Sequence, residues 1–364
     1  MFKQMELYVG NTNVVDNSTS AYHYKAYVSF FSSFIFGTSQ NRSLFQIETL
    51  LSYGYDAKST HLQSALFHRD WSDSCDQNKT KSGDTKSGYY KRKQVVEKSL
   101  EVPFCTQLHI DFLTCSRWLP PGVPMKLKMI RNDDNFVIVA ETGTYKIKFL
   151  SLNLEFQKII VDPKVTQREL QKLHGGDPYR MPFLMSKQIT HTIPSGRSSF
   201  QINDLYTGML PRQLILCFVR HDSYNADITK NGYIFENLNI TNLVFKVNGE
   251  NIPSTEYRPD FTAANVDCVR EYQHFLDSIG IKRLNSGVGI TIQDFAKHCC
   301  FWILDLTPEK CNNNHVHIGI NGTIALAMTF GTQTPTNYQL MGYGVYPVQA
   351  VIDKDMNCTL VDNI

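Results

Sequence analysis

Apolar and polar residues alternate along several short segments of this chain, which is the pattern of a β-strand with one buried face. In residues 323–330 every second side chain, from Ile324 to Phe330, is large and apolar, while Thr and Ala fill the positions between. The same alternation recurs at residues 108–112, 125–131, 145–149 and 242–247. Many short strands of this kind predict a sandwich or a barrel.

Two further segments, 213–219 and 299–306, are continuously apolar, and we interpret them as strands buried on both faces. Asn248 and Gly249 follow an alternating segment and predict a tight hairpin turn, because both residue types tolerate a positive φ. The expected fold class is therefore all-β.

Helix signals are few and short. Thr166–Glu169 matches a capping box for a helix that Gly175 and Gly176 would end, and Thr60–Gln63 matches another. Thr262 precedes a helical segment, 263–278, with Gly280 as its stop. Strand patterns resume on both sides of the first helix. We therefore expect a β domain at 1–161, a helical connector at 162–188 and a second β domain at 189–364.

Composition limits the class of protein. The chain has 36 Lys and Arg against 34 Asp and Glu, which excludes a generally basic, DNA-coating protein. Its 9 cysteines, odd in number and irregularly spaced, favour reduced thiols over a disulfide framework. The apolar run Val28–Phe36 is too short to span a bilayer, and residues 1–16 lack the features of a signal peptide. We expect neither a membrane span nor secretion.

The polar, basic stretch at residues 77–94 has two interpretations. It is either a solvated loop between strands or a phosphate-contacting loop in which Tyr89 and Tyr90 stack on bases. A cluster this short would support at most weak, non-specific contact with nucleic acid.

Sequence patterns for catalysis are absent. His315 and His317 alternate as two ligands of one metal ion would, and cupins use such a His-x-His pair, but the Glu that cupins place a few residues later is missing. Cys299 and Cys300 begin an apolar run and are interpreted as buried small hydrophobes. The sequence has neither a G-x-S-x-G elbow nor a phosphate-binding loop. We predict no catalytic, cofactor-binding or metal-binding residue, and no enzyme.

Four stretches carry a resemblance to a known family: "IETLLSYGYDAKSTHLQSALFHRD", "GGDPYRMPF", "LPRQLILCFVRHDSYNADITKNGYIFENLNITNLVFKVNGENIPS" and "FWILDLTPEKCNNNHVHIGINGTIALAMTF". Together they resemble double jelly-roll major capsid proteins, in particular those of Polinton (Maverick)-type and adintovirus-like elements integrated in animal genomes. The resemblance runs in order over nearly the whole chain and is strongest at residues 210–253.

The resemblance implies a double jelly roll, that is, two tandem antiparallel β-sandwiches of eight strands each, with a few short helices in the loops and the connector. It also implies a homotrimer that forms a pseudo-hexameric capsomer of an icosahedral capsid. The expected partners are the chain itself, minor capsid proteins and penton proteins. The expected location is the virion, with assembly in the cytoplasm or nucleus of a host cell.

The chain departs from the family at two places. The relatives carry further residues before the position of Met1, including an N-terminal arm and first strands, so we expect an N-terminally truncated copy whose first jelly roll is incomplete. The segment Val28–Gln46 has no counterpart in the relatives. Because Val-Ser and Phe-Gln can encode the consensus ends of a spliceosomal intron, we interpret this segment as a retained intron; the alternative is a surface insertion.

Two other functions stay open. One is a domesticated host protein that keeps a jelly-roll surface for binding without capsid assembly. The other is a cupin-like metalloenzyme. Self-assembly separates the capsid subunit from the first alternative, and metal content separates it from the second.

Overall fold

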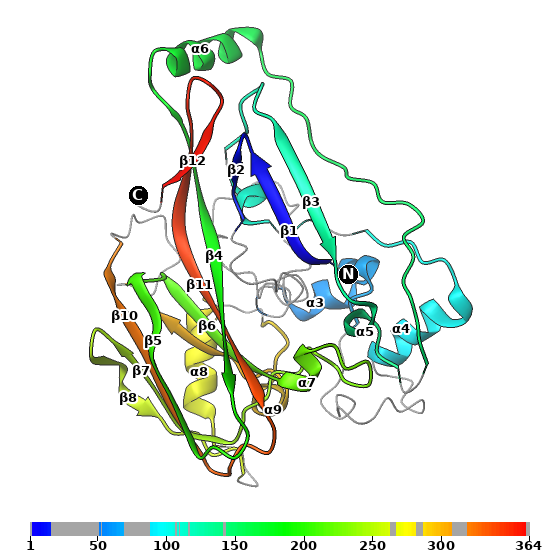
Figure 1. The fold of residues 1–364 in the computed structure, drawn as a ribbon, viewed down its shortest axis with the longest axis vertical. Helices are drawn as coiled ribbons and strands as arrows, with labels where there is room; N and C mark the ends of the chain where they lie inside the picture. Colours follow the sequence, from blue (N-terminus) through cyan, green and yellow to red (C-terminus); the bar gives the residue numbers. More distant parts are fainter. Residues whose placement is uncertain are drawn as a thin grey trace.

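The computed structural model describes residues 2–15, 51, 53–68, 88–105, 108, 110–115, 117–140, 143–262, 267–281, 287–307 and 319–361. Within them, sheets dominate and the helices are short (Figure 1). The all-β prediction is confirmed. Among the described residues, no helix is long and apolar enough to span a membrane.

The second half of the chain is a sandwich of two sheets (Figure 1). The four-stranded sheet has the order β5-β10-β7-β8, with bounds Ser199–Met209, Asn321–Phe330, Ile240–Val247 and Glu250–Tyr257. The five-stranded sheet has the order β12-β11-β6-β9, with β4 paired to β11; the bounds are Cys358–Val361, Tyr338–Ile352, Gln213–Arg220, Trp302–Asp305 and Tyr179–Ile193. This sandwich contains most of the core.

The alternation predicted for β10 is observed. Ile324, Leu326, Met328 and Phe330 are buried, because they face the five-stranded sheet across the sandwich. The predicted hairpin joins β7 to β8, and Asn248 and Gly249 both adopt a positive φ there. In β6 every residue from Gln213 to Val219 is buried, as predicted for a strand covered on both faces.

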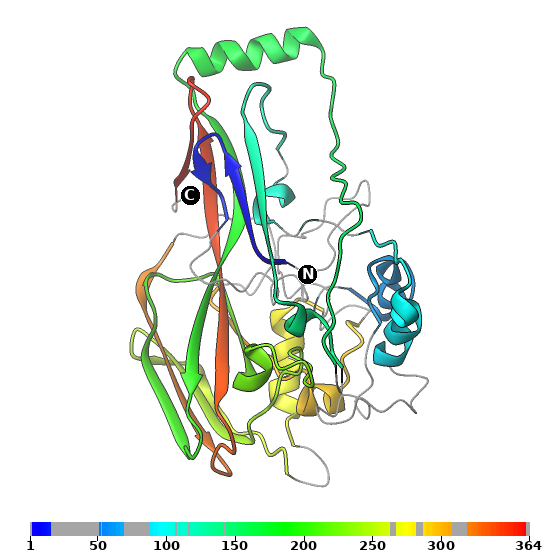
Figure 2. The same cartoon turned by 45° about the vertical axis from the view of Figure 1, so that its right-hand side comes forward.

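Trp302, the first residue of β9, and Phe301, just before it, show what covers the two faces of the five-stranded sheet at this point. The Trp302 ring contacts Tyr257 of the four-stranded sheet, whereas the Phe301 ring beside it contacts Phe275 of helix α8 (Val269–Ser278). Because adjacent strand residues point to opposite faces, α8 lies on the outer face of the five-stranded sheet. Figure 2 shows this order of layers: the four-stranded sheet, the five-stranded sheet, then α8 and helix α9 (Ile292–Lys297).

Strands β4 and β11 form a ribbon of 15 paired residues, from Tyr179 opposite Ile352 to Ile193 opposite Tyr338. At about 3.4 Å per residue this ribbon is about 50 Å long. Its lower part pairs with β6 and its upper part with β12. The ribbon therefore extends from the second-half sandwich into the upper region of the molecule, where the first half packs (Figure 1).

The described part of the first half contains a three-stranded sheet of order β2-β1-β3, with bounds Thr12–Asn13, Phe2–Val9 and Met125–Arg131. Its hairpin turn packs against the start of β12: the Thr12 hydroxyl donates to the Cys358 carbonyl. Buried residues of both halves form one continuous hydrophobic core.

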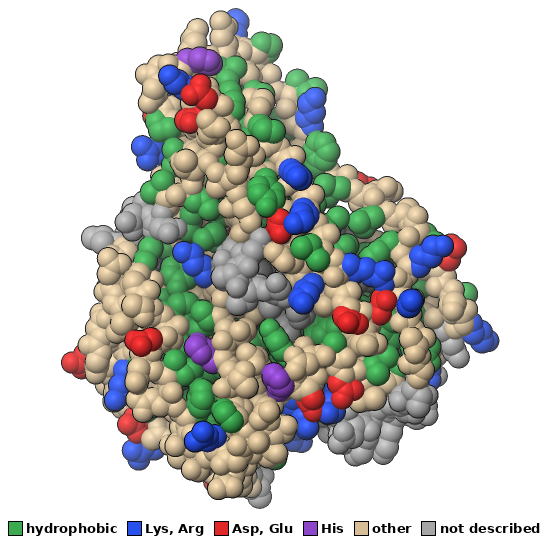
Figure 3. Space-filling view, viewed as in Figure 1, with side chains coloured by type: hydrophobic (Ala, Val, Ile, Leu, Met, Phe, Trp, Pro, Cys, Tyr) green, Lys and Arg blue, Asp and Glu red, His purple; other side chains and the backbone are tan. Residues whose placement is uncertain are grey.

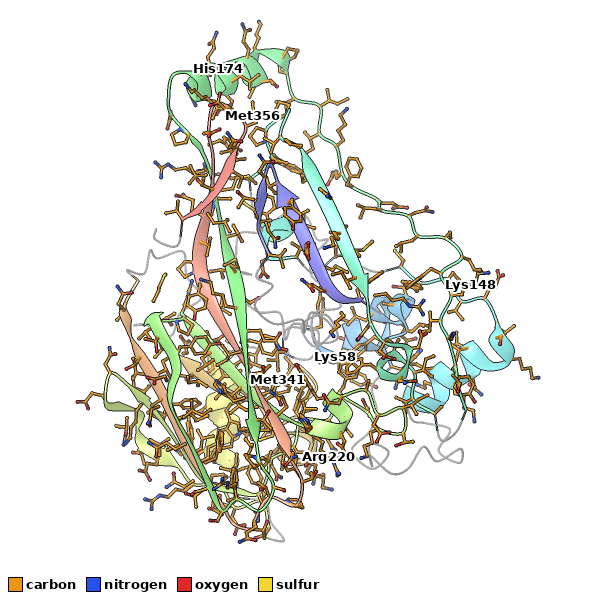
Figure 4. The ribbon with its side chains drawn as sticks, in the orientation of Figure 1. Lys58, Lys148, His174, Arg220, Met341 and Met356 are labelled. Atoms are coloured by element: carbon orange, nitrogen blue, oxygen red, sulfur yellow. The ribbon has the colours of Figure 1, made fainter. Side chains whose placement is uncertain are left out.

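The remaining helices lie mostly outside the sheets. They are α3 (Tyr55–Ser59), α4 (Gly88–Val96), α5 (Asp134–Val137), α6 (Pro163–His174) and α7 (His221–Tyr224), with 3₁₀ helices η1 (His61–Ala65), η2 (Glu97–Ser99) and η3 (Asp111–Thr114). Figure 4 labels Lys58 of α3, whose buried ammonium donates to the Val288 carbonyl at 2.5 Å and so ties the first half to the second.

Helix α6 lies within the segment expected as a connector, but it starts earlier than predicted. Its N-cap is Asp162, whose carboxylate accepts the Lys164 N–H at 2.8 Å, and Pro163 occupies the first turn. The predicted capping residue Thr166 is therefore inside the helix. Strand β4 then begins at Tyr179 and continues past residue 188, so the predicted end of the connector falls inside a strand.

Two predicted strands are wrong. In the first, predicted at 108–112, Asp111 and Phe112 belong to η3 instead, and the alternation reflects the anchoring of Ile110 and Phe112 in the core. Residues 145–149 form no strand because side chains bind their backbone: the Ile147 N–H donates to Asp134 at 3.2 Å, and the Arg131 guanidinium donates to the Ile147 carbonyl. The basic stretch expected as a loop is helical from Gly88 onward.

The buried Asp111 carboxylate joins η3 to the ribbon. One of its oxygens accepts both the backbone N–H and the hydroxyl of Ser186 in β4, each at 3.0 Å. Close by, the Phe112 ring makes an edge contact with Phe183 at 5.5 Å. The turn therefore depends on a buried polar contact as well as on apolar packing.

We expect Asp111→Ala to lower the free energy of unfolding by about 1–3 kcal/mol, because it leaves the buried Ser186 N–H without its acceptor. Ser186→Ala is the matched control: it removes only the hydroxyl and should cost less, about 1 kcal/mol. Urea unfolding of the two variants measures the difference. A larger loss for Ser186→Ala would contradict the assignment of the carboxylate as the anchor.

Candidate assembly surface

Large apolar side chains that reach the surface are concentrated in the first half. Of those exposed in the described residues, only Val269, Ile320 and Val361 come after residue 165. The others include Trp118, Met125 and a run between Leu150 and Val161. Figure 3 shows hydrophobic side chains along the upper right flank, where this run lies. Apolar surface on this scale is typical of an interaction site.

Residues 150–161, which we call the arm, are extended, and every one of them is exposed (Figure 2). Leu150, Leu152, Leu154 and Phe156 alternate with polar residues, and the Phe156 side chain is 77% exposed. This is the pattern of a strand with one apolar face. In the described residues the arm pairs with no strand, so its apolar face is left in water.

Both ends of the arm are anchored. At its start, the Phe149 ring stacks on Phe2 of β1 at 5.7 Å, and the Arg131 guanidinium lies 5.7 Å from the same ring. At its end, Asp162 caps helix α6. Figure 4 labels Lys148 just before the arm and His174 at the end of α6, at opposite ends of the flank along which the arm runs.

Strand β3 is the outer strand of the three-stranded sheet in the described residues. Leu127 and Met129 pack against the core, whereas Lys126 and Lys128 point to the other, polar face. The Lys128 ammonium lies 3.2 Å from Glu6 of β1. The Tyr8 hydroxyl, which donates to Glu6 at 3.0 Å, lowers the pKa of that carboxyl, and Lys128 lowers it further.

The second half presents a more polar surface. Asp222, at the start of α7, lies 3.3 Å from the Arg220 guanidinium and also pairs with Lys230. Lys230 in turn lies 3.3 Å from Asp227. The Thr229 hydroxyl, which donates to Asp227 at 2.7 Å, lowers the pKa of that carboxyl. These charges hold the loop after β6 in place.

Within the part of the chain that the structure describes, side chains capable of chemistry form no assembled metal site. His315 and His317 lie outside the described residues, and so does Val28–Gln46. Within the described ranges, no three His, Cys, Asp or Glu side chains are grouped so as to hold a metal ion. Burial holds the pKa of the Cys300 thiol well above its ordinary value, which makes it a poor nucleophile.

The basic stretch is only partly described. Residues 88–94 lie in α4, where Lys91 and Lys93 are exposed, and the Arg92 guanidinium donates to the His68 carbonyl at 2.5 Å. Residues 77–87 and the side chains of Tyr89 and Tyr90 lie outside the description. The arm is not predicted from the sequence, although the alternation of Leu150–Phe156 directly follows the strand predicted at residues 145–149.

Several known proteins are similar to this chain. No family model matches. An uncharacterized protein of Caenorhabditis elegans is 23% identical over 92% of this chain and 73% of that protein. A chain in the cryo-EM structure of the Sputnik virophage matches with a TM-score of 0.52 at 12% identity, over 100% of this chain and 74% of that one. The mavirus major capsid protein gives a TM-score of 0.37 at 9% identity, over 99% and 76%. The Sputnik likeness supports the double jelly-roll fold class predicted above.

Proposed function

We propose that this chain is a structural subunit of a viral capsid, with a building role rather than a catalytic one. The observation that carries the proposal is the likeness of its fold, along the whole chain, to a chain of the Sputnik virophage at a TM-score of 0.52. The rigid second-half sandwich and the apolar surface of the first half agree with such a role, because a shell subunit must hold its shape and bind copies of itself.

The finer form of the proposal follows from the sequence resemblance. The chain would form homotrimers, each a pseudo-hexameric capsomer, in an icosahedral capsid that also contains minor capsid and penton proteins. Its origin would be a Polinton-type element integrated in an animal genome, and its location the virion. We retain the division into a first jelly roll at 1–161, a connector at 162–188 and a second jelly roll at 189–364 as part of this proposal.

Particle size tests the proposal. We expect the chain without Val28–Gln46 to sediment as a trimer, at three times the mass of the shortened chain, which is below the 41.7 kDa of the full sequence, and as larger shells at high concentration. A ring-closing contact of this kind should bury more than about 2,000 Å² in total. The full chain should aggregate more readily, because the removed segment adds apolar residues. Analytical ultracentrifugation and negative-stain microscopy of both forms provide the measurement.

A clean monomer at all concentrations would instead favour the second candidate, a host jelly-roll protein that binds a protein or glycan without assembling. The polar, ion-paired surface of the second half, around Asp222 and Lys230, is the feature that favours this alternative. Such a surface suits transient binding better than a permanent shell contact.

A further inference from the structure

We propose that the arm, residues 150–161, pairs as an added strand with the outer edge of β3 in a second copy of the chain. This inference rests on the proposed function, since it names the contact through which copies assemble. Strand addition requires a segment with strand alternation and an open sheet edge, and each copy carries both. The arm is exposed along its whole length, and β3 has no outer neighbour in the described residues.

One antiparallel register of the arm on β3 matches the two strands on both faces of the sheet. It aligns the apolar side chains of the arm with the core-facing side of β3, and the polar side chains of the two strands with each other. The pairs are Met125 with Phe156, Lys126 with Glu155, Leu127 with Leu154, Lys128 with Asn153 and Met129 with Leu152. The apolar stripe of the arm would then continue the packed face of Leu127 and Met129.

Charge favours the same register. Glu155 is the acidic residue of the arm, and it would lie directly opposite Lys126, a position where opposite charges stabilise a pair of strands. Lys128 already has an acidic neighbour, Glu6, on the other side of β3. Of the two lysines on this face of β3, Lys126 is therefore the one that the register places opposite an acidic residue of the arm.

The partner is a second copy because one copy holds its own arm and edge apart. Phe149 and Asp162 fix the two ends of the arm, and between them it runs clear of β3 in both views (Figures 1 and 2). Met125 on the edge is 53% exposed and Phe156 on the arm is 77% exposed. Two copies in neighbouring trimers, related by a twofold axis, would place each arm on the other copy's edge and cover both.

Charge reversal tests this pairing between copies. Glu155→Lys alone places two lysines opposite each other, and Lys126→Glu alone places two glutamates opposite each other. Each variant should therefore self-associate about tenfold more weakly than the unchanged chain. An equimolar mixture of the two variants should regain the original affinity, because each arm then meets an edge of opposite charge. Sedimentation velocity measures all three samples, and melting temperatures should agree with that of the unchanged chain.

The apolar contact between arm and edge is tested by Leu154→Asp, which should abolish association. The matched control is Val269→Asp, a substitution at a residue of α8 that is 53% exposed and remote from the arm; it should have no effect. If the unchanged chain assembles and Leu154→Asp assembles equally well, the arm proposal is wrong while the capsid proposal stands. If the unchanged chain never associates, both are wrong.

One result would show instead that the arm pairs with β3 of its own chain. In that case the chain carrying both Glu155→Lys and Lys126→Glu would regain the properties of the unchanged chain, whereas the mixture of single variants would not. If the arm pairs between copies, self-association should recover both in the chain with the two substitutions and in the mixture of single variants.

Discussion

Phe301→Ala should lower the free energy of unfolding by about 3–5 kcal/mol, the usual cost of deleting a buried aromatic ring. Its side chain is 1% exposed, and its ring lies 4.7 Å from that of Phe235 and 6.4 Å from that of Phe275. These rings join the five-stranded sheet to α8, so a cavity there would loosen the covering layer as well as the strand.

Hydrogen exchange of the β6 amides measures this loss, because β6 pairs with β9 beside the substituted residue. The matched control is Phe156→Ala on the exposed arm, which removes the same ring from water and should change stability by less than about 0.5 kcal/mol. Equal effects of the two substitutions would mean that α8 does not cover the five-stranded sheet in the way described.

The second-half strands could be predicted because their local pattern and their tertiary environment agree. In β10 and β7 the alternation of side chains matches one buried and one exposed face, and in β6 the unbroken apolar run matches burial on both. Asn248 and Gly249 fix the hairpin through backbone conformation alone. No distant residue has to be known for such elements to be predicted.

The errors arise where a distant side chain decides the backbone. Residues 145–149 alternate as a strand does, but Asp134 and Arg131 bind the backbone of Ile147 and leave no role for a neighbouring strand there. Residues 108–112 alternate as well, but Asp111 turns toward Ser186 of β4. Periodicity reports which side chains are buried and not what the backbone pairs with, so it could not distinguish these cases.

The candidate surface was harder to predict for the same reason. Alternation in Leu150–Phe156 is visible in the sequence, but only the three-dimensional arrangement leaves these residues exposed beside an open edge. A strand pattern normally implies a buried face within the same chain. Here the described fold provides no such face, and a neighbouring copy supplies one in our proposal.

Gly10→Val should also be strongly destabilising, because this residue is where the first-half sheet meets the second half. Gly10 has a φ of +59°, and an added Cβ would lie 3.1 Å from the Met356 carbonyl oxygen and 3.3 Å from the Cys358 nitrogen. Figure 4 labels Met356 in this turn before β12. Both atoms are backbone and have little freedom to move, so a branched side chain has to push the β1–β2 hairpin away from β12.

We expect Gly10→Val to cost about 3–4 kcal/mol, from left-handed backbone strain and from overpacking together. Gly196→Val separates the two causes: its φ is +75°, but an added Cβ would meet no described atom within 4 Å, so only the strain of about 1–2 kcal/mol should appear. Urea unfolding gives both costs, and hydrogen exchange of the β1 amides should rise only in Gly10→Val. Equal costs for the two variants would show that contact with β12 does not hold the first-half sheet in place.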